Sequence, residues 1–320
     1  MNEDELNLVT LAQRFSDPEA ARTYLEELRW PGGVPVCPFC GSEGGRLNRQ
    51  PSGKRKAQKG VCKCKNKECR KQFTVTKGTV FESSHVNISL WMMCMFIMCA
   101  SKKGVSAHQI HRMLHVTYKT AWFMCHRIRY AMNEGPLSEL LGGIVEVDET
   151  YVGGKARGHK NAFTRKACVV GLVERGPKGR KRSVMVDRVT GKNLRAAIRE
   201  HTAQSAEIHT DSYVGYSRVF MRQHHETVNH EKKEYARVRK DGTLVTTNTA
   251  EASFAIIKRA VYGTFHHVSK RHLHRYLSEF DFKWNTCKDS DGERTHAALS
   301  MIEGKRLLYR DSLAANTNPA

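Results

Sequence analysis

Residues 143–155 read GIVEVDETYVGGK, and this stretch decides the fold of the second half of the chain. From Val145 to Asp148 valines alternate with acidic residues, which is the period-two pattern of a half-buried strand. Glu146 and Asp148 therefore share one face of that strand, where a carboxylate is costly without a partner. Hard divalent cations such as Mg²⁺ take oxygen ligands of this kind. The pattern predicts an acidic strand face that holds a metal, against the simpler alternative of a solvated edge strand.

Charge and composition narrow the class of protein. The chain has 320 residues, and Lys plus Arg outnumber Asp plus Glu by 53 to 32, a net charge of +21. Because the basic excess is spread through the chain, it indicates a polyanionic partner rather than a basic tail. The longest apolar stretch, residues 90–100, is too short to span a bilayer. The ten cysteines are unevenly spaced, which favours a reduced, cytoplasmic and partly metal-bound protein over a disulfide scaffold.

The N-terminal part contains a cysteine pattern typical of a zinc ribbon. Residues 2–28 are expected to form two helices, the second capped by Asp17 with Pro18 at its first position. Cys37 and Cys40 then form one knuckle, Cys-x-x-Cys followed by glycine, and three cysteines compete for the second knuckle. Four thiolates complete a closed tetrahedral zinc site, which is structural rather than catalytic. We assign the second pair to Cys64 and Cys69, with Cys62 as the alternative to Cys64. The expected domains are N-terminal helices over 1–34 and a zinc ribbon over 35–80.

Residues 85–135 are expected to form a helix-turn-helix region. Apolar periodicity predicts helices over 90–100, 106–114 and 117–132, with Ser106 and Thr117 as N-caps. The short connection between the last two helices is what a helix-turn-helix needs. The alternative is a three-helix bundle with a solvated basic face. If the last helix enters a DNA groove, its candidate contact residues are Tyr118, Lys119, His126, Arg127 and Arg129.

The second half of the chain predicts an α/β domain over residues 140–300. Strands over 167–173 and 183–189 follow the acidic strand, then a helix over 193–201 and a strand over 207–211. Three antiparallel strands, a helix and a strand in this order are typical of the ribonuclease-H-like fold, a mixed sheet. Its first and fourth strands are neighbours, so Asp148 and Asp211 should face each other. Two close carboxylates repel until cations bind between them, as in two-metal phosphoryl transfer.

A third polar group should come from a helix that begins near Asn248. Asn248 is expected to cap this helix, with Glu251 as the acid of a capping box. That is also the purely structural interpretation of both residues. Lys258 follows Glu251 by seven residues and so lies on the same face of the helix, where an acid can bind a metal and a base a DNA phosphate.

Several motifs together resemble the insertion-sequence transposases of the DDE type, in particular the bacterial group with an N-terminal zinc ribbon (the ISXO-type transposases). The resemblance covers about residues 10–300 and is specific as a set. It implies that Asp148 and Asp211 are the first two catalytic acids and that either Asn248 or Glu251 is the third, followed by Lys258. On chemical grounds we favour Glu251, since a carboxylate offsets metal charge. The matching stretches are WPGG (30–33), CPFC (37–40), CRKQFTV (69–75), GTVFE (78–82), YKTAWF (118–123), VDETYVGGK (147–155) and YGTFHHVS (262–269).

The resemblance also implies an activity and its partners. A DNA transposase would use Mg²⁺ or Mn²⁺ to cleave element ends and join the 3′-hydroxyl to target DNA. The zinc ribbon and helix-turn-helix would bind terminal inverted repeats of double-stranded DNA at the nucleoid, with a homodimer or larger assembly on paired ends and no membrane partner. The alternatives are a nuclease on the same fold and a catalytically silent DNA-binding regulator derived from a transposase.

A few remaining residues receive lower-ranked interpretations. Glu146, Glu149 and Asp187 are further acids that could stand in at the site. The tail over 301–320 is expected to be disordered from about residue 311. Four histidines lie among basic neighbours that would repel a cation, so a basic surface near DNA is expected there rather than a metal site: His266, His267, His272 and His274.

Overall fold

A computed structural model describes residues 6–46, 60–133, 139–153, 166–177, 179–216 and 224–309 of the chain. The chain divides into two compact units, each treated separately below. Unit 1 consists of Met1–Ser101, Ala107–Met132 and Lys288–Leu313, and unit 2 of Lys102–Ser106, Asn133–Cys287 and Ala314–Ala320. None of the helices within the described ranges combines the length and the apolar character needed to cross a bilayer.

Unit 1 is built mainly from helices, several of which begin at the predicted caps. The Asp17 side chain accepts the N–H of Glu19 (3.1 Å), and that of Thr117 accepts the N–H of Thr120 (3.2 Å). These bonds satisfy donors that a helix start leaves open. The helices are α1 (Leu8–Arg14), α2 (Pro18–Arg29), α3 (Ile88–Ala100), α4 (Ala107–Leu114), α5 (Tyr118–Ala131) and α9 (Asp291–Ser300).

Helix α9 and the segment after it belong to unit 1, whereas the predicted α/β domain ran to residue 300. The Arg294 side chain donates to the backbone carbonyl of Cys99 (3.2 Å) at the end of α3. Ile302 and Leu307 are buried, although the predicted tail begins at residue 301. The part expected to be disordered lies outside the described residues.

The predicted ribbon is a small antiparallel sheet of three strands in the order β1-β2-β3. These are β1 (Gly44–Arg46), β2 (Cys62–Cys64) and β3 (Gln72–Phe73). Strand β3 ends at Phe73, and the chain then turns with a bond from the Lys77 N–H to the Thr74 carbonyl (3.0 Å). So small a sheet buries little apolar surface of its own.

Unit 2 contains a five-stranded mixed sheet in the order β6-β5-β4-β7-β8. As predicted, β4 pairs antiparallel with β5 and β5 with β6, and β7 lies parallel beside β4; β8 extends the sheet parallel to β7. The predicted order of three strands, a helix and a strand is confirmed for residues 144–211, whereas β8 was not predicted. The strands are β4 (Ile144–Val152), β5 (Ala167–Glu174), β6 (Lys181–Val186), β7 (Glu207–Asp211) and β8 (His225–Val228), and α6 (Gly191–His201) connects β6 to β7.

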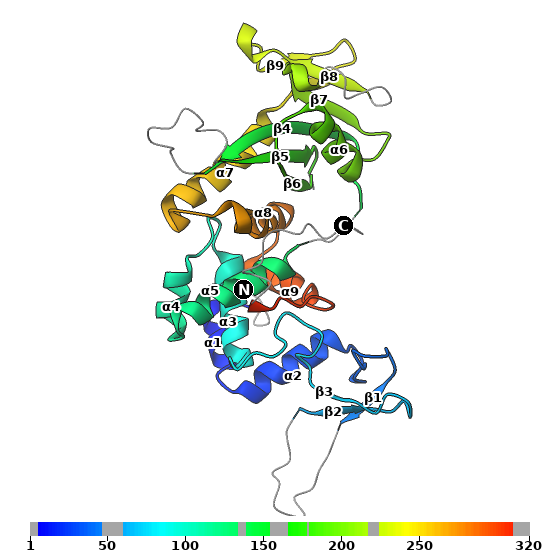
Figure 1. Ribbon diagram of the computed structural model, residues 1–320, viewed down its shortest axis with the longest axis vertical. Helices are drawn as coiled ribbons and strands as arrows, with labels where there is room; N and C mark the ends of the chain where they lie inside the picture. The colour runs from blue at the N-terminus through cyan, green and yellow to red at the C-terminus, as the bar shows by residue number, and fades with distance from the viewer. Residues whose placement is uncertain are drawn as a thin grey trace, which may run out of the picture. The chain divides into compact units, whose positions relative to one another are not determined.

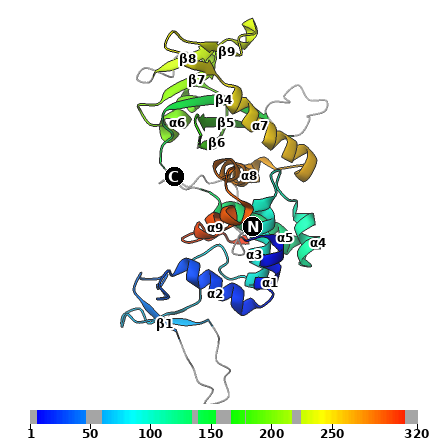
Figure 2. The ribbon, with the colours of Figure 1, turned by 180° about the vertical axis from the view of Figure 1, so that it is seen from behind.

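Helices cover both faces of this sheet (Figure 1 and, from behind, Figure 2). Leu194 and Ile198 of α6 pack in one apolar core with Val145 and Val147 of β4. On the other face, α7 (Asn248–Ala260) and α8 (Lys270–Asn285) pack against Val152 and neighbouring residues of β5. A hairpin of β9 (Ala236–Val238) and β10 (Leu244–Thr246) leads into α7. Short helical turns are Val214–Tyr216, His230–Lys232 and the π-helix Val261–Phe265.

Candidate active site and zinc site

Two of the predicted catalytic acids lie at the same level on neighbouring strands. The β4–β7 register pairs Glu146 with His209, and two residues further along both parallel strands stand Asp148 and Asp211. Both aspartates are half-buried. Asp211 ends β7, and its carboxylate accepts the N–H of Tyr213 (3.1 Å), which fixes the turn that follows. The strand pairing therefore brings these two carboxylates to one place.

Asp148 experiences the negative charge of three other acids. Burial raises the pKa of Asp148 to about 7. The charges of Glu149, Asp211 and Glu251 act in the same direction as burial and are part of this shift of the Asp148 pKa, so α7 contributes an acid to the same neighbourhood. Carboxylates that oppose one another's ionisation are a usual setting for divalent cations. Within the described ranges, no three acidic or histidine side chains lie as close together as the four cysteines discussed below.

The close approach of α7 to the sheet depends on a glycine. Gly171 of β5 lies opposite Asp148, and a Cβ on it would meet the ring of Phe254 at 2.7 Å. The missing side chain lets the Phe254 ring pack directly on the strand. As a result the first turn of α7, which carries Asn248 and Glu251, lies on the same face of the sheet as Asp148.

The predicted capping role of Asn248 and Glu251 is wrong. The N-cap of α7 is Thr247, Asn248 is the first helical residue, and no capping box forms. Instead the Thr247 hydroxyl donates to Glu251 (3.2 Å), and the buried Glu146 of β4 accepts N–H groups of the first turn. Asn248 and Glu251 are both exposed, which leaves their side chains accessible to a ligand.

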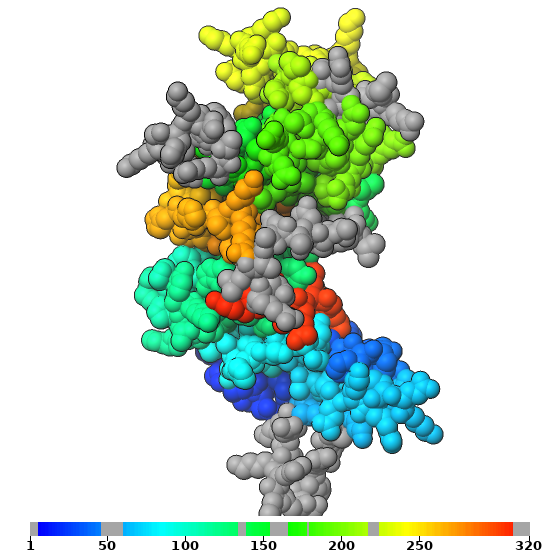
Figure 3. Space-filling model, viewed as in Figure 1, coloured from blue at the N-terminus to red at the C-terminus, as the bar shows by residue number. Residues whose placement is uncertain are grey.

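Lys258 lies on the surface two turns along α7 from Glu251. Both side chains are exposed, as the spacing predicts. Arg259 and Tyr262, which follow along the chain, are exposed as well. The segment around the end of α7 lies at the surface in Figure 3, in orange. This face of α7 therefore offers an acid near Asp148 and basic and aromatic groups further along.

The half-buried Glu149 bonds to the buried Tyr216 near the aspartates, a pairing that was not predicted from the sequence. The Tyr216 hydroxyl donates to the Glu149 carboxylate (2.6 Å), and burial together with this carboxylate raises the Tyr216 pKa well above its usual range. The alternation of β4 places Glu149 on the α6 face, opposite to that of Asp148. The DSYVGY run after β7 is the signal that could have pointed to a partner for it.

Four cysteines of the ribbon come together as the motif predicts. The sulfurs of Cys37, Cys40, Cys64 and Cys69 all lie within 4.8 Å of one another. Two of the separations are 3.4 Å (Cys40–Cys64) and 3.9 Å (Cys37–Cys69). A tetrahedral zinc with Zn–S bonds of about 2.3 Å would set its sulfurs about 3.8 Å apart. The donor set and spacing fit a structural Zn²⁺, and Cys62 is not part of the cluster.

The geometry of the knuckles explains why the cysteines converge. Gly41 follows Cys40 with a φ of +72°, and its N–H bonds to the Cys37 carbonyl (2.9 Å). Such a left-handed residue turns the chain tightly, which glycine does at little cost. The second knuckle turns at Arg70, which has a positive φ and donates its N–H to the Asn66 carbonyl (3.0 Å).

The predicted DNA-contacting face of α5 is only partly exposed. Tyr118 and Lys119 are exposed in its first turn, and Tyr118 stacks on His108 of α4 with ring centroids 4.3 Å apart. Only three residues, His115–Thr117, separate α4 from α5.

The expectation that His126, Arg127 and Arg129 also lie on an exposed face is wrong, since all three are buried. Arg127 donates to the backbone carbonyls of Glu82 (2.6 Å) and Leu307 (3.2 Å). The guanidinium of Arg127 thus serves the packing of unit 1.

The histidine-rich segment before and within α8 is divided between surface and interior. His266 and His267 are exposed. Burial lowers the pKa of His272 and of His274 to about 4 in each case, and the Arg275 charge acts in the same direction. These two rings are therefore neutral at physiological pH.

Comparison with known proteins gives matches in both units. The chain matches a family described as the ISXO2-like transposase domain over residues 140–285, and one described as the transposase zinc-ribbon domain over residues 16–72. It is also similar to the "uncharacterized protein in transposable element ISH50" of Halobacterium salinarum. The two are 28% identical over 290 residues, which cover 84% of this chain and 91% of that protein.

Proposed function

We propose that this chain, which belongs to the insertion-sequence transposases that combine a zinc ribbon with an ISXO2-like transposase domain, cleaves the ends of its element and joins them to target DNA. The observation that carries the proposal is the pairing of β4 with β7, since it puts Asp148 level with Asp211. The topology of the sheet supports a ribonuclease-H-like fold, in which this pair of strands carries the catalytic acids.

Three side chains are proposed to hold the catalytic cations. Asp148 and Asp211 would bind Mg²⁺ or Mn²⁺, and Glu251 would add a carboxylate from α7. The raised pKa of Asp148 supports this donor set, since the acids around it need positive charge to ionise together. When bound, such ions supply charge that stabilises phosphoryl transfer. We favour Glu251 over Asn248 because its charge acts on Asp148.

The other groups of the site are proposed to handle the DNA. Lys258, exposed on the same face of α7 as Glu251, would bind a backbone phosphate and keep the scissile bond beside the carboxylates. Glu149, held by Tyr216, would fix the strand position next to Asp148.

We propose that unit 1 recognises the element. The zinc ribbon together with α4 and α5, as a helix-turn-helix, would bind the terminal inverted repeats through exposed residues such as Tyr118 and Lys119. The net charge of +21 supports binding to DNA backbones, which would place the protein at the nucleoid. A dimer or larger assembly would bring two element ends together.

A strand-transfer assay tests the proposal. Zinc-loaded protein is incubated with Mg²⁺, a plasmid and either uncut or pre-cleaved ends of its own element, and cut and joined products are measured. We expect joining by the wild type, none by Asp148→Asn, and wild-type joining by Asp187→Asn, a matched change of an exposed acid. Glu251→Gln should abolish joining and Asn248→Ala should not.

Other outcomes would favour the alternatives. Cutting without joining would favour a nuclease on the same fold. Tight binding to the ends with neither reaction would favour a silent regulator, and the proposed function would be wrong.

A further inference from the structure

Glu146 is a completely buried carboxylate that faces α7 two residues before Asp148. None of its surface is exposed. One carboxylate oxygen accepts the N–H groups of Thr249 (2.7 Å) and Ala250 (3.1 Å). The other accepts the Thr249 hydroxyl (3.0 Å) and Nε–H of Arg175 (2.7 Å). Four donors, one of them on the guanidinium of Arg175, compensate for burying this charge.

This carboxylate caps α7, because the side chain of the N-cap residue does not; locally, the Thr246 hydroxyl accepts the N–H of Asn248 (3.2 Å). The N-cap residue Thr247 makes no side-chain capping bond, and its hydroxyl donates to Glu251. The first N–H groups of a helix need acceptors, and negative charge is favoured there. Glu146 meets both needs from β4. The position of the first turn of α7 is therefore set by the strand that carries Asp148.

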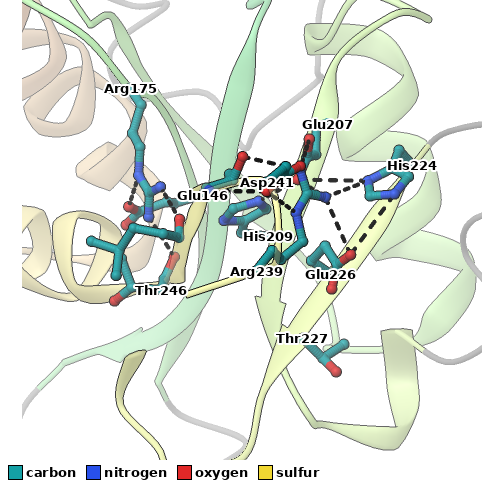
Figure 4. A network of polar contacts seen from close by, with 12 residues as sticks. Glu146, Arg175, Glu207, His209, His224, Glu226, Thr227, Arg239, Asp241 and Thr246 are labelled. Carbon is teal, nitrogen blue, oxygen red and sulfur yellow. Dashed lines mark hydrogen bonds and ion pairs between the residues drawn. The ribbon is translucent and has the colours of Figure 1, made fainter. Parts of the chain in front are cut away.

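Arg175 extends the same contact to the strand that leads into α7. It directly follows β5, and its guanidinium also donates to the backbone carbonyls of Leu244 and Thr246 in β10 (Figure 4). Thr246 precedes the N-cap of α7 by one residue. The ion pair thus holds both the helix and its entrance against β4.

The consequence concerns the distance between two acids of the site. Asp148 lies about 7 Å along β4 from Glu146. Glu146 also accepts the N–H of Ala250, the residue directly before Glu251. A shift of α7 along β4 changes the separation of Asp148 and Glu251, and metal sites tolerate errors of only about 0.5 Å.

We propose that Glu146 and Arg175 are positioning residues that hold the α7 carboxylate at its working distance from Asp148. The proposal rests on the proposed function. The charge matters as well as the shape: a glutamine at position 146 would keep one acceptor oxygen and turn its NH₂ group either toward the N–H groups of Thr249 and Ala250 or toward Nε–H of Arg175. Either orientation removes the cap of α7 or the bond to its entrance, and with it the fixed spacing of the site.

The test compares Glu146→Gln with a matched change in the same sheet. Glu226 of β8 is also mostly buried and pairs with Arg237 and with Arg239 (3.3 Å), so Glu226→Gln breaks a similar pair that holds the β9–β10 hairpin rather than the first turn of α7 (Figure 4). Hydrogen–deuterium exchange of residues 246–254 in the zinc-loaded protein reports the cap. Two measurements report the affinity of the proposed site for metal. One is manganese binding, followed by electron paramagnetic resonance, and the other is the Mg²⁺ concentration for half-maximal strand transfer.

We expect faster exchange in the first turn of α7 and about 10–100-fold weaker metal binding in Glu146→Gln, with both unchanged in Glu226→Gln. Wild-type metal binding in Glu146→Gln would overturn the proposal, even if the variant were less stable. If Glu146→Gln does not fold, Arg175→Lys takes its place. This variant keeps the positive charge but loses the several hydrogen bonds of the guanidinium, and hydrogen exchange and metal binding are measured in the same way.

The two proposals fail in different ways. A wild type that binds manganese but joins no DNA would reject the proposed function, and exchange and metal binding would still decide the role of Glu146. If the wild type joins DNA and Glu146→Gln needs the same Mg²⁺ concentration as the wild type, only the positioning role is rejected.

Discussion

The carboxyl group of Asp148 should make the metal-free site less stable as the pH rises. Burial and neighbouring acids raise its pKa from the usual 3.8 to about 7. The unfolded chain therefore loses this proton near pH 4 and the folded chain only near pH 7. The contribution of the group to stability is complete below about pH 4 and is lost as the pH rises through 7.

Asp148→Asn should remove this dependence. In buffer with no divalent cation beyond the bound zinc, we expect the free energy of unfolding of the variant at pH 8 to exceed that of the wild type by about 1–3 kcal/mol. At pH 4 we expect the two proteins to be equally stable. Thermal unfolding at the two pH values measures this. Asp187→Asn, which alters an exposed acid, serves as the control. An Asp148→Asn protein that is no more stable than the wild type at pH 8 would contradict the argument.

Some residues of the site follow from the sequence and others do not. Alternation along β4 and the order of elements were enough to predict that Asp148 and Asp211 are neighbours. The partner of Glu146 could not be predicted, because Thr249 is about a hundred residues away and the bond depends on how α7 packs. Asn248 and Glu251 have the spacing of a local capping box, but the long-range carboxylate occupies the N–H groups that a local cap would bind.

Two basic residues of helix α5 are expected to have different roles, Lys119 in DNA binding and Arg127 in packing. Lys119 is exposed, whereas Arg127 is buried and bonded to two backbone carbonyls. We expect Lys119→Met to weaken DNA binding and to lower the salt dependence by about one unit of slope without loss of stability. Arg127→Met should cost about 2 kcal/mol or more of unfolding free energy, because it leaves buried acceptors without a donor.

Binding titrations at several salt concentrations, beside chemical denaturation, distinguish the two variants. If Arg127→Met kept full stability and lost affinity for DNA, the assignment of Arg127 to packing would be wrong. The sequence could not reveal its burial, since its acceptors come from Glu82 and Leu307, far away in the chain.

The zinc ribbon should depend on its metal. With strands of two or three residues, the sheet is too small to be stable alone, so metal binding supplies much of its folding free energy. Cys64→Ala should abolish the bound zinc, whereas Cys62→Ala, a matched change of a buried cysteine two residues away, should keep one zinc per chain. Native mass spectrometry measures the stoichiometry. Loss of zinc in Cys62→Ala alone would reverse the assignment.

At the scale of the whole molecule, the chain does not fold in simple sequence order. The elements of unit 2 follow one another nearly without interruption, which is why their order was predictable. Unit 1 collects three separate segments, and α9 returns to it through the buried Arg294 and its bond to the Cys99 carbonyl. A helix pattern alone does not indicate which core will receive the helix, because that depends on complementary packing over long sequence distances.

Two compact units with separate cores should unfold in two steps. Calorimetry of the zinc-loaded protein at pH 8 should show two transitions. Removal of zinc acts on the ribbon in unit 1 and should lower only one of them. Asp148→Asn acts on the sheet of unit 2 and should raise only the other, since it removes the unfavourable buried charge. A single transition that moves with both changes would mean that the units unfold together, and the two perturbations could then no longer be assigned to separate cores.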